Sequence, residues 1–275
     1  MTQTISTDAV ARHYSAGGLL DRVADNLRAA GFPDGAAIPV DALAPLDQFH
    51  TRGLEATIEL AALAGAGRDM RVLDVGSGIG GPARHLAAHH GCRVTGVDLT
   101  DDFVQVARYL SERTGLADRV AFQTADGTRL PFEAERFDLV WCQHVVMNIA
   151  DRPALYREMH RVLRPGGRLA TYDVVEGPGG PLHYPVPWAD DESQTHLLTA
   201  EATQAALGAA GFRIAAVRDA TPAALAAIAK GPPPTPPRIT LAQVMRSGFG
   251  EMIANHGRNL REDRVRLAMF LGERG

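Results

Sequence analysis

The sequence predicts an α/β protein built on a mostly parallel sheet, with helices on both faces. Between Arg71 and Arg218, short apolar runs alternate with segments of helical periodicity. Runs of this length, bounded by Gly, Pro or Asp, are typical of buried strands. A repeat of strand and helix indicates right-handed βαβ units, which place consecutive strands parallel.

Five strands and their connecting helices follow in order. We expect strands in RVLDVG (71–76), CRVTGVDL (92–99), VAFQTAD (120–126), FDLVWCQHVVM (137–147) and RLATYDVV (168–175). Helices are expected at 82–90, where Pro82 suits the first turn, after Thr100 as N-cap, and near Pro153. RPGG (164–167) predicts a turn before the fifth strand.

The flanking regions interrupt this alternation. Residues 1–65 carry helical patterns and are expected to form an N-terminal helical cap, with residues 66–275 as the main domain. The Pro- and Gly-rich segment 176–198 is too long for a simple connection and is expected to be a lid-like insertion. A helical insertion is expected at 221–260, between a strand at FRIAAVRDA and a final apolar run, RLAMFLGE.

Composition limits the classes of function. The 275-residue chain has 45% hydrophobic residues, 22% charged residues and a net charge of −4, which gives no electrostatic case for binding nucleic acid. Cys92 and Cys142 lie far apart, as expected in a reducing compartment. The first residues lack a signal-peptide pattern, and the apolar stretch 139–150 is too short to span a bilayer. These features predict a cytoplasmic protein without a membrane partner.

The loop VLDVGSGIGG (72–81) contains Gly76, Gly78 and Gly81 in a G-x-G-x-x-G spacing, with Asp74 two residues before it. A dinucleotide would place its pyrophosphate on this loop, close to the Asp74 carboxylate, which would repel it. S-adenosylmethionine (SAM) has no phosphate, and its ammonium suits Asp74, while the loop N–H groups suit its carboxylate. The loop therefore favours SAM over NAD.

Two further acids end the next strands. Asp98 is placed to accept the ribose hydroxyls, and Asp126 to accept from the adenine amine. Both lie at carboxyl ends of strands, where open α/β sheets bind ligands. The alternative for each is a helix N-cap or a solvated turn residue.

With these motifs in place, residues 71–175 resemble class I SAM-dependent methyltransferases. VLDVGSGIGG is similar to their first motif, including Ser77; GVDLT to the second, including Leu99; and TADGTRLPF to the third, including Gly127. FDLVWCQHV and RVLRPGGRL are similar to the segments around the fourth and fifth strands. The resemblance implies a Rossmann-like seven-stranded, mostly parallel sheet with an antiparallel last strand, in which FRIAAVRDA and RLAMFLGE pair at one edge.

A narrower resemblance concerns the acceptor. GGPARHLA, HVVMNIADR and YDVVEGPGGPLHYPVPWA are similar to bacterial sarcosine and dimethylglycine N-methyltransferases, and also to quinol and tocopherol methyltransferases. The first resemblance implies a small carboxylated amine as acceptor; the second implies O- or C-methylation of a quinol or natural product. An RNA-modifying enzyme and a non-catalytic SAM-binding protein are the remaining alternatives.

Candidate acceptor residues come from segments expected to flank the methyl group. Gln143 and His144 follow the fourth strand, and His144 is a candidate to orient the acceptor or take its proton. The resemblance gives weight to Tyr14 and His50 near the N-terminus. Other candidates for the acceptor are Met147, Asn148, Tyr184 and Trp188, and Arg52 or Arg84 for an acceptor carboxylate.

His85 and His89 stand four residues apart on a predicted helix, as a metal pair would. No third ligand of suitable spacing is evident in the sequence, so no metal is predicted. The expected partner is a small-molecule methyl acceptor, with the chain as a monomer or homodimer.

Overall fold

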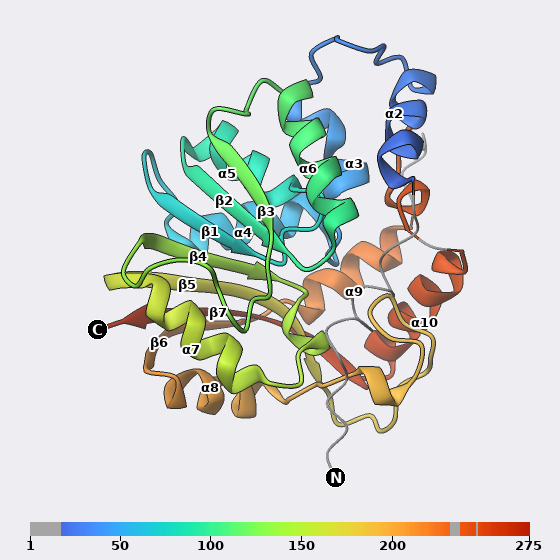
Figure 1. Ribbon diagram of the computed structural model, residues 1–275. Coiled ribbons are helices and arrows are strands. Elements are labelled where there is room, and N and C mark those ends of the chain that lie inside the picture. Colours follow the sequence, from blue (N-terminus) through green and yellow to red (C-terminus); the bar gives the residue numbers. More distant parts are fainter. Residues whose placement is uncertain (1–17, 232–236, 246) are drawn as a thin grey trace.

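A computed structural model describes residues 18–231, 237–245 and 247–275 (Figure 1). Tyr14, a predicted site residue, lies outside the described residues. Seven strands form one sheet in the order β3-β2-β1-β4-β5-β7-β6. The strands are β1 (Arg71–Val75), β2 (Arg93–Asp98), β3 (Val120–Thr124), β4 (Phe137–Gln143), β5 (Leu163–Glu176), β6 (Phe212–Asp219) and β7 (Val265–Arg274).

The sheet confirms the predicted fold class. Strands β1 to β5 pair in parallel, and β7 is antiparallel to both β5 and β6. The two segments expected to pair at one edge, β6 and β7, do so. The antiparallel last strand therefore fits between β5 and the edge strand.

Helices cover both faces of the sheet and surround one end of it (Figure 1). They are α2 (Leu19–Ala29), η1 (Val40–Leu43), α3 (Ala44–Asp47), α4 (Gly53–Ala64), α5 (Gly81–His90), α6 (Asp101–Arg113), η2 (Val146–Asn148), α7 (Arg152–Val162), η3 (Glu192–Gln194), α8 (Ala200–Ala209), α9 (Thr221–Lys230), η4 (Leu241–Gln243) and α10 (Phe249–Arg261). Among the described residues, no helix is long and apolar enough to cross a membrane.

Alternation along the central strands divides the core into two layers. Val72 of β1 packs in the cluster that contains α4, α5 and α9, whereas Leu73 packs in the cluster that contains α7 and α8. Successive side chains of a strand point to opposite faces, so a strand buried on both faces is apolar throughout. This explains why these strands read as continuous apolar runs.

The turn expected at 164–167 has a different form in the structure. Phe137 of β4 pairs with Leu163, and the next pair is Leu139 with Arg168. One β4 residue therefore faces four β5 residues, and RPGG forms a bulge inside β5, with Gly166 at φ 72°. Glycine adopts positive φ without strain. The change of chain direction at RPGG was therefore predicted correctly, whereas the start of the strand, expected at 168, lies at Leu163.

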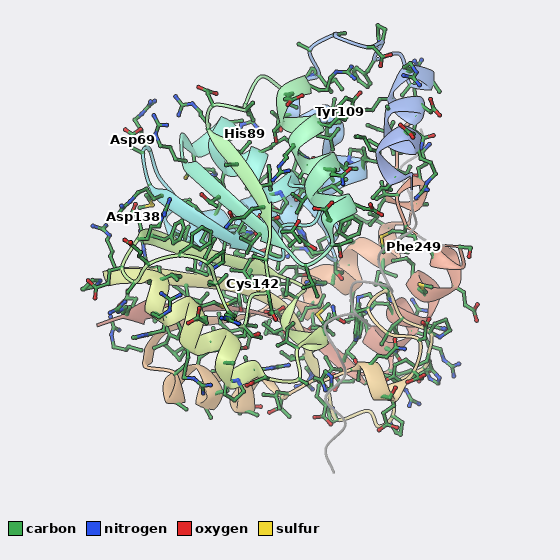
Figure 2. The ribbon with its side chains drawn as sticks, viewed as in Figure 1. Asp69, His89, Tyr109, Asp138, Cys142 and Phe249 are labelled. Atoms are coloured by element: carbon green, nitrogen blue, oxygen red, sulfur yellow. The ribbon has the colours of Figure 1, made fainter. Side chains whose placement is uncertain are left out.

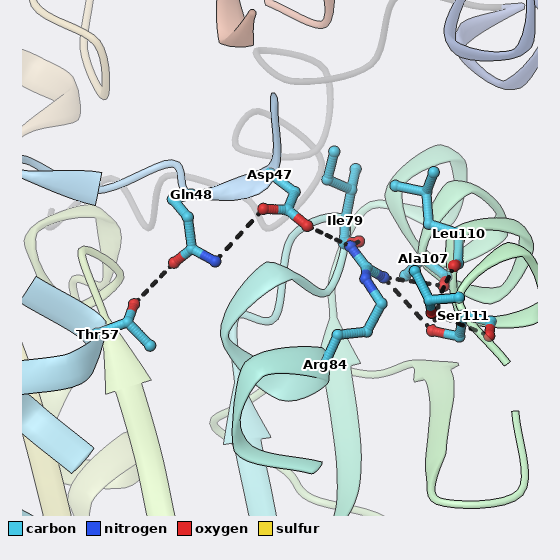
Figure 3. Close-up of polar contacts among 9 residues, drawn as sticks. Asp47, Gln48, Thr57, Ile79, Arg84, Ala107, Leu110 and Ser111 are labelled. Carbon is cyan, nitrogen blue, oxygen red and sulfur yellow. Dashed lines mark hydrogen bonds and ion pairs between the residues drawn. The ribbon is translucent and has the colours of Figure 1, made fainter. Parts of the chain in front are cut away.

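A buried polar network connects the end of α3 with α5 of the sheet domain (Figure 3). Arg84 of α5 is fully buried; its Nη2 donates to Asp47 Oδ2 at 2.8 Å and to the Ile79 carbonyl at 2.7 Å. Gln48 extends the network from Asp47 to Thr57 of α4. Arg84 was expected on the surface or against an acceptor carboxylate. The structure contradicts both, because the guanidinium neutralises a carboxylate of the cap.

Candidate functional site

A cavity of about 930 Å³ opens at the carboxyl ends of β1, β2 and β4. Its walls come from the glycine loop, the segment 47–52 before α4, the residues after β4, Trp188 of the insertion and the C-terminal helix α10. All predicted cofactor residues line it: Asp74, Gly76, Ser77, Gly78, Asp98, Leu99, Asp126, Gly127 and Gln143. The predicted acceptor residues His50, His144, Met147, Asn148 and Trp188 line it too.

Two glycines of the loop are required by close packing. Gly76 has φ 73°, and a Cβ there would lie 2.2 Å from Val145 Cγ2. A Cβ on Gly81 would lie 2.2 Å from the Asp47 carbonyl oxygen. The third glycine of the motif is therefore needed where the N-terminal cap packs on α5.

The loop N–H groups differ from the expectation that they suit a ligand carboxylate. Gly76 and Ser77 donate to the Val97 carbonyl at 2.8 and 3.0 Å, and Gly78 donates to Asp98 Oδ2 at 2.8 Å. These three donors are used to hold the loop against the end of β2. These three N–H groups are therefore not free to bind a ligand carboxylate.

Five buried polar atoms on cavity residues have no hydrogen-bond partner in the described part of the chain, and three of them belong to predicted cofactor residues: Asp74 Oδ2, Ser77 Oγ and Gln143 Nε2. The Asp74 side chain is 2% exposed, and burial, together with the nearby Asp98, raises its pKa to about 8. Trp141 Nε1 donates to Gln143 Oε1 at 2.8 Å, which fixes the Gln143 amide with its N–H groups unused. Once ionised by a nearby cation, the Asp74 carboxylate can accept from the ammonium of SAM, and the two donor-capable groups in the same cavity suit SAM's carboxylate.

The other two acids differ in how they are held. Asp98 accepts from Gly78 N and from Thr100 N, at 2.8 and 2.9 Å, and burial raises its pKa. Thr100 is the N-cap of α6 as expected, but its side chain makes no capping bond. Asp126 Oδ1 accepts from the backbone and hydroxyl of Thr128, both at 2.8 Å, so it also serves as a turn residue.

His144 is held at both ring nitrogens. Its Nδ1 lies 3.1 Å from the Tyr172 carbonyl, which can only accept, so we assign the proton to Nδ1. Its Nε2 then accepts from Thr51 N at 3.2 Å and from Thr51 Oγ1 at 3.1 Å. Burial lowers the His144 pKa to about 4, and its backbone has φ 53°. A neutral ring with its lone pair already engaged is suited to shaping the cavity rather than to accepting a proton.

Two other histidines complete a polar strip in the cavity wall. Because Thr51 Oγ1 donates to His144, it accepts from Nε2 of His256, 3.0 Å away. His256 Nδ1 is buried without a partner among the described residues. His50 Nε2 donates to the Gly53 carbonyl at 2.9 Å, which leaves the His50 lone pair on Nδ1. Burial, and then the neighbouring His144, lowers the pKa of both His50 and His256 to about 3.

Asp173 of β5 fixes the turn that carries His144. Its Oδ1 accepts from the backbone of Val145 and Val146 at 3.2 and 3.4 Å. The Asp173 side chain is fully buried, and burial raises its pKa to about 6.

The insertion 176–198 contributes one of its two predicted aromatic residues to the cavity. Trp188 is 3% exposed, donates from Nε1 to Thr195 Oγ1 at 2.6 Å and packs edge-to-face on His256. Tyr184 is half-buried within the insertion and does not line the cavity. Two residues after β4 that were predicted for the acceptor, Met147 and Asn148, are in η2 at the cavity edge.

Sequence reasoning missed an apolar wall of the cavity. Phe49, Met245, Phe249 and Ile253 line the cavity together with Ile228. Ile228 and Ile253 are 36% and 47% exposed, and they are two of the four exposed large hydrophobic residues found among those described. The helical periodicity of 241–256 was visible in the sequence, but it gave no sign that one face would line a cavity.

Comparison with known proteins gives a family match for the central part of the chain, which holds the strand-end residues of the cavity. Residues 73–171 match a family model described as a methyltransferase domain. Over 151 residues the chain is 38% identical to methyltransferase GfsG of Streptomyces halstedii. The aligned region covers 55% of this chain and 51% of that protein. Over 116 residues it is 37% identical to sterol 24-C-methyltransferase ERG6 of Saccharomyces cerevisiae, covering 42% and 30%. The chain thus matches about half the length of the first relative and less than a third of the second.

Solved structures with the same fold cover more of the chain. A geranyl diphosphate C-methyltransferase from Streptomyces coelicolor A3(2) covers all of both chains, with TM-score 0.68 and 19% identity. A putative sarcosine dimethylglycine methyltransferase from Galdieria sulphuraria covers 80% of this chain and 84% of its own, with TM-score 0.58 and 18% identity. At these identities the likeness shows the fold alone. Residues 73–171 thus resemble a methyltransferase domain, and the sheet around them has the fold of these solved methyltransferases.

Proposed function

We propose that this protein transfers the methyl group of SAM to a small molecule whose body is largely apolar. The observation that carries this proposal is the continuity of the cavity: it runs from the acids at the strand ends to the wall of Phe249, Ile253 and Trp188. With SAM at the strand ends, the acceptor lies against this wall, and an apolar wall favours a largely apolar acceptor.

The cofactor end supports SAM through charge. Asp74 is the group for the ammonium, and Ser77 and Gln143 supply donors for the carboxylate. Asp98, held by two backbone N–H groups, keeps an oxygen lone pair on each carboxylate oxygen for the ribose hydroxyls. In SAM the methyl carbon is bonded to a positive sulfur. A lone pair of an oxygen acceptor, or the π electron pair of a carbon acceptor, forms the new bond, the C–S electrons return to sulfur, and the acceptor's proton passes to solvent.

The acceptor end supports an apolar molecule with one nucleophilic atom. A cavity of about 930 Å³ is at the upper end of the ~300–1,000 Å³ typical of small-molecule sites, so it can hold SAM and a second ligand. Between the two ends lie three neutral histidines, and His50 Nδ1 is the lone pair best placed to accept from an acceptor hydroxyl. With its pKa lowered to about 3, His50 orients that hydroxyl rather than removing its proton at neutral pH.

Two of the related proteins are consistent with this choice. The relatives include a 27-O-demethylrifamycin SV methyltransferase of Amycolatopsis mediterranei, 36% identical over 142 residues, besides the sterol methyltransferase. The acceptors in their names, a demethylrifamycin and a sterol, are large molecules with extensive apolar surface. We transfer only this chemical class to the present chain, and propose O- or C-methylation of a natural product.

A small carboxylated amine of the sarcosine type is the second candidate. Arg52 favours it, because Arg52 lines the cavity and its Nε is buried without a partner in the described part of the chain. Its Nη1, however, already pairs with Glu59 Oε2 at 2.7 Å, so the charge available to an acceptor carboxylate is partly used.

The test measures cofactor binding first and methyl transfer second. Titration calorimetry with SAM, S-adenosylhomocysteine and NAD should show binding of the two adenosyl ligands and none of NAD. Transfer of labelled methyl is then measured to sarcosine, to dimethylglycine and to hydroxylated polyketides and quinols. Phe249→Ala should raise the KM of the apolar acceptors and leave SAM affinity unchanged, whereas Arg52→Gln should affect only a carboxylated amine. Methyl uptake by sarcosine alone, unaffected by Phe249→Ala, would overturn the apolar assignment.

The division into an N-terminal cap (1–65) and a main domain (66–275) is part of the same proposal. So are the cytoplasmic location and a monomeric or homodimeric state.

A further inference from the structure

Three potential metal ligands meet on the surface between the N-terminal cap and α5. His85 and His89 lie on successive turns of α5, and Asp41 comes from η1. One ligand atom from each residue lies within 4.8 Å of the others. His89 Nε2 is 2.8 Å from Asp41 Oδ1, and the two imidazole rings are 4.6 Å apart. The sequence showed no third ligand at a suitable spacing. In the folded protein, Asp41 comes close enough to be that ligand.

His85 shows that the cluster is more than a surface ion pair. Its side chain is 5% exposed, yet Nδ1 has no hydrogen-bond partner among the described residues. Buried polar atoms in proteins are nearly always satisfied, so an orphaned imidazole nitrogen beside a His–Asp pair indicates an absent partner. A cation bound through this nitrogen would account for it and for the carboxylate together.

We propose that Asp41, His85 and His89 bind a divalent transition-metal ion, with Zn²⁺ as the best match and solvent at the remaining position. Two imidazoles and one carboxylate are a borderline donor set, which suits Zn²⁺ and disfavours Mg²⁺ and Ca²⁺. Tetrahedral ligands at about 2.0–2.1 Å from Zn²⁺ stand roughly 3.3 Å apart, so small side-chain rotations from the present arrangement suffice. The surface position leaves room for a bound water.

The place of the cluster in the fold indicates a structural ion. Helix α5 begins at the glycine loop and runs back along the sheet, so His89 lies about 12 Å along the helix from Gly81. In Figure 2, His89 lies far from Phe249 in the cavity wall. The ion would join η1 of the cap to α5, next to the buried Asp47–Arg84 pair. This inference does not rest on the proposed methyl transfer.

The test uses the untagged full chain, freed of metal by chelation. Titration with ZnCl₂ should give one ion per chain, with no comparable binding of MgCl₂, and Zn²⁺ should raise the Tm. Co²⁺ should give visible absorption bands typical of tetrahedral coordination. Asp41→Asn and His89→Gln change exposed side chains, so both variants should fold, and each should weaken Zn²⁺ binding at least about tenfold.

The matched control is His183→Gln, which also removes an imidazole paired with an acid, Glu262, on another part of the surface. It should bind Zn²⁺ as the parent protein does. Absence of stoichiometric Zn²⁺ binding, or equal binding by the parent, Asp41→Asn and His89→Gln proteins, would overturn the proposal.

Discussion

Asp74→Asn is expected to stabilise the ligand-free protein while it weakens SAM binding. Asp74 is 2% exposed, its Oδ2 has no hydrogen-bond partner among the described residues, and burial raises its pKa to about 8. At neutral pH the carboxyl is therefore mostly protonated in the folded protein, whereas in the unfolded chain it is ionised. Folding must take up a proton, and this opposes stability.

The size of the effect follows from the linkage between proton binding and folding. The interval between the ordinary Asp pKa of 3.8 and pH 7 corresponds to about 4 kcal/mol, at about 1.4 kcal/mol per pH unit. Asparagine avoids this cost but leaves buried amide N–H groups unsatisfied, at about 1–3 kcal/mol. The net gain in the free energy of unfolding is then about 1–3 kcal/mol at pH 7.

The sign of the pH dependence is a separate check. Between about pH 4 and pH 8 the folded state binds more protons at Asp74 than the unfolded state does, so the parent protein loses stability as the pH rises. At pH 5 the cost of protonation falls to about 2 kcal/mol, and the advantage of Asp74→Asn should nearly vanish. Below pH 4 it should be absent.

The assay is urea unfolding at pH 5 and pH 7, followed by the fluorescence of the buried Trp141 and Trp188. Calorimetry of the same samples should show SAM binding weakened about tenfold or more, because a charge-assisted hydrogen bond to the ammonium is lost. Asp118→Asn, at an exposed aspartate, should change neither quantity. A variant less stable than the parent at pH 7, or equally shifted at both pH values, would refute the reasoning about Asp74.

Three further outcomes are expected. SAM binding at pH 7 should release up to one proton as Asp74 ionises beside the ammonium, measured by calorimetry in buffers of different ionisation enthalpy; a binding heat independent of buffer would contradict this. Gly81→Ala should destabilise the protein by about 1–3 kcal/mol in urea unfolding, because its Cβ meets the Asp47 carbonyl oxygen at 2.2 Å, whereas Gly208→Ala in α8, with open space around it, should be neutral or stabilising. Arg84→Met should cost about 3–5 kcal/mol in the same measurement by leaving the Asp47 carboxylate buried alone, and an unchanged midpoint would show that the pair is dispensable.

The sheet could be predicted because its signals are local. A short apolar run that ends in Gly or Asp is typical of a buried strand, and β1 and β2 follow this pattern, whereas β4 was recognised from its apolar run alone. The gathering of the proposed cofactor residues in one place could be predicted for the same reason, because the carboxyl ends of parallel strands meet at one edge of the sheet. Asp74, Asp98 and Asp126 line one cavity although 52 positions separate the first from the last.

Contacts between distant segments could not be predicted from local signals. Arg84 looks like a surface helix residue in the sequence, and only the fold brings Asp47 to it. The loop N–H groups looked free for a ligand until β2 placed the Val97 carbonyl against them. Thr51, which bonds His144, and Asp41, which bonds His89, lie 93 and 48 residues from those histidines along the chain.

The acceptor end of the cavity shows most clearly why specificity is harder to read than cofactor binding. In α10, Met252 is 2% exposed and packs in the interior, while its neighbour Ile253 is 47% exposed and lines the cavity. In the sequence, an apolar helix face that packs in the core looks the same as one that lines a cavity. The pattern shows only that the face is apolar, and not what covers it. This helix lies outside residues 73–171, the part that matches the methyltransferase family model. The family match thus fixes the cofactor chemistry, and the choice of acceptor depends on side chains that the match does not reach.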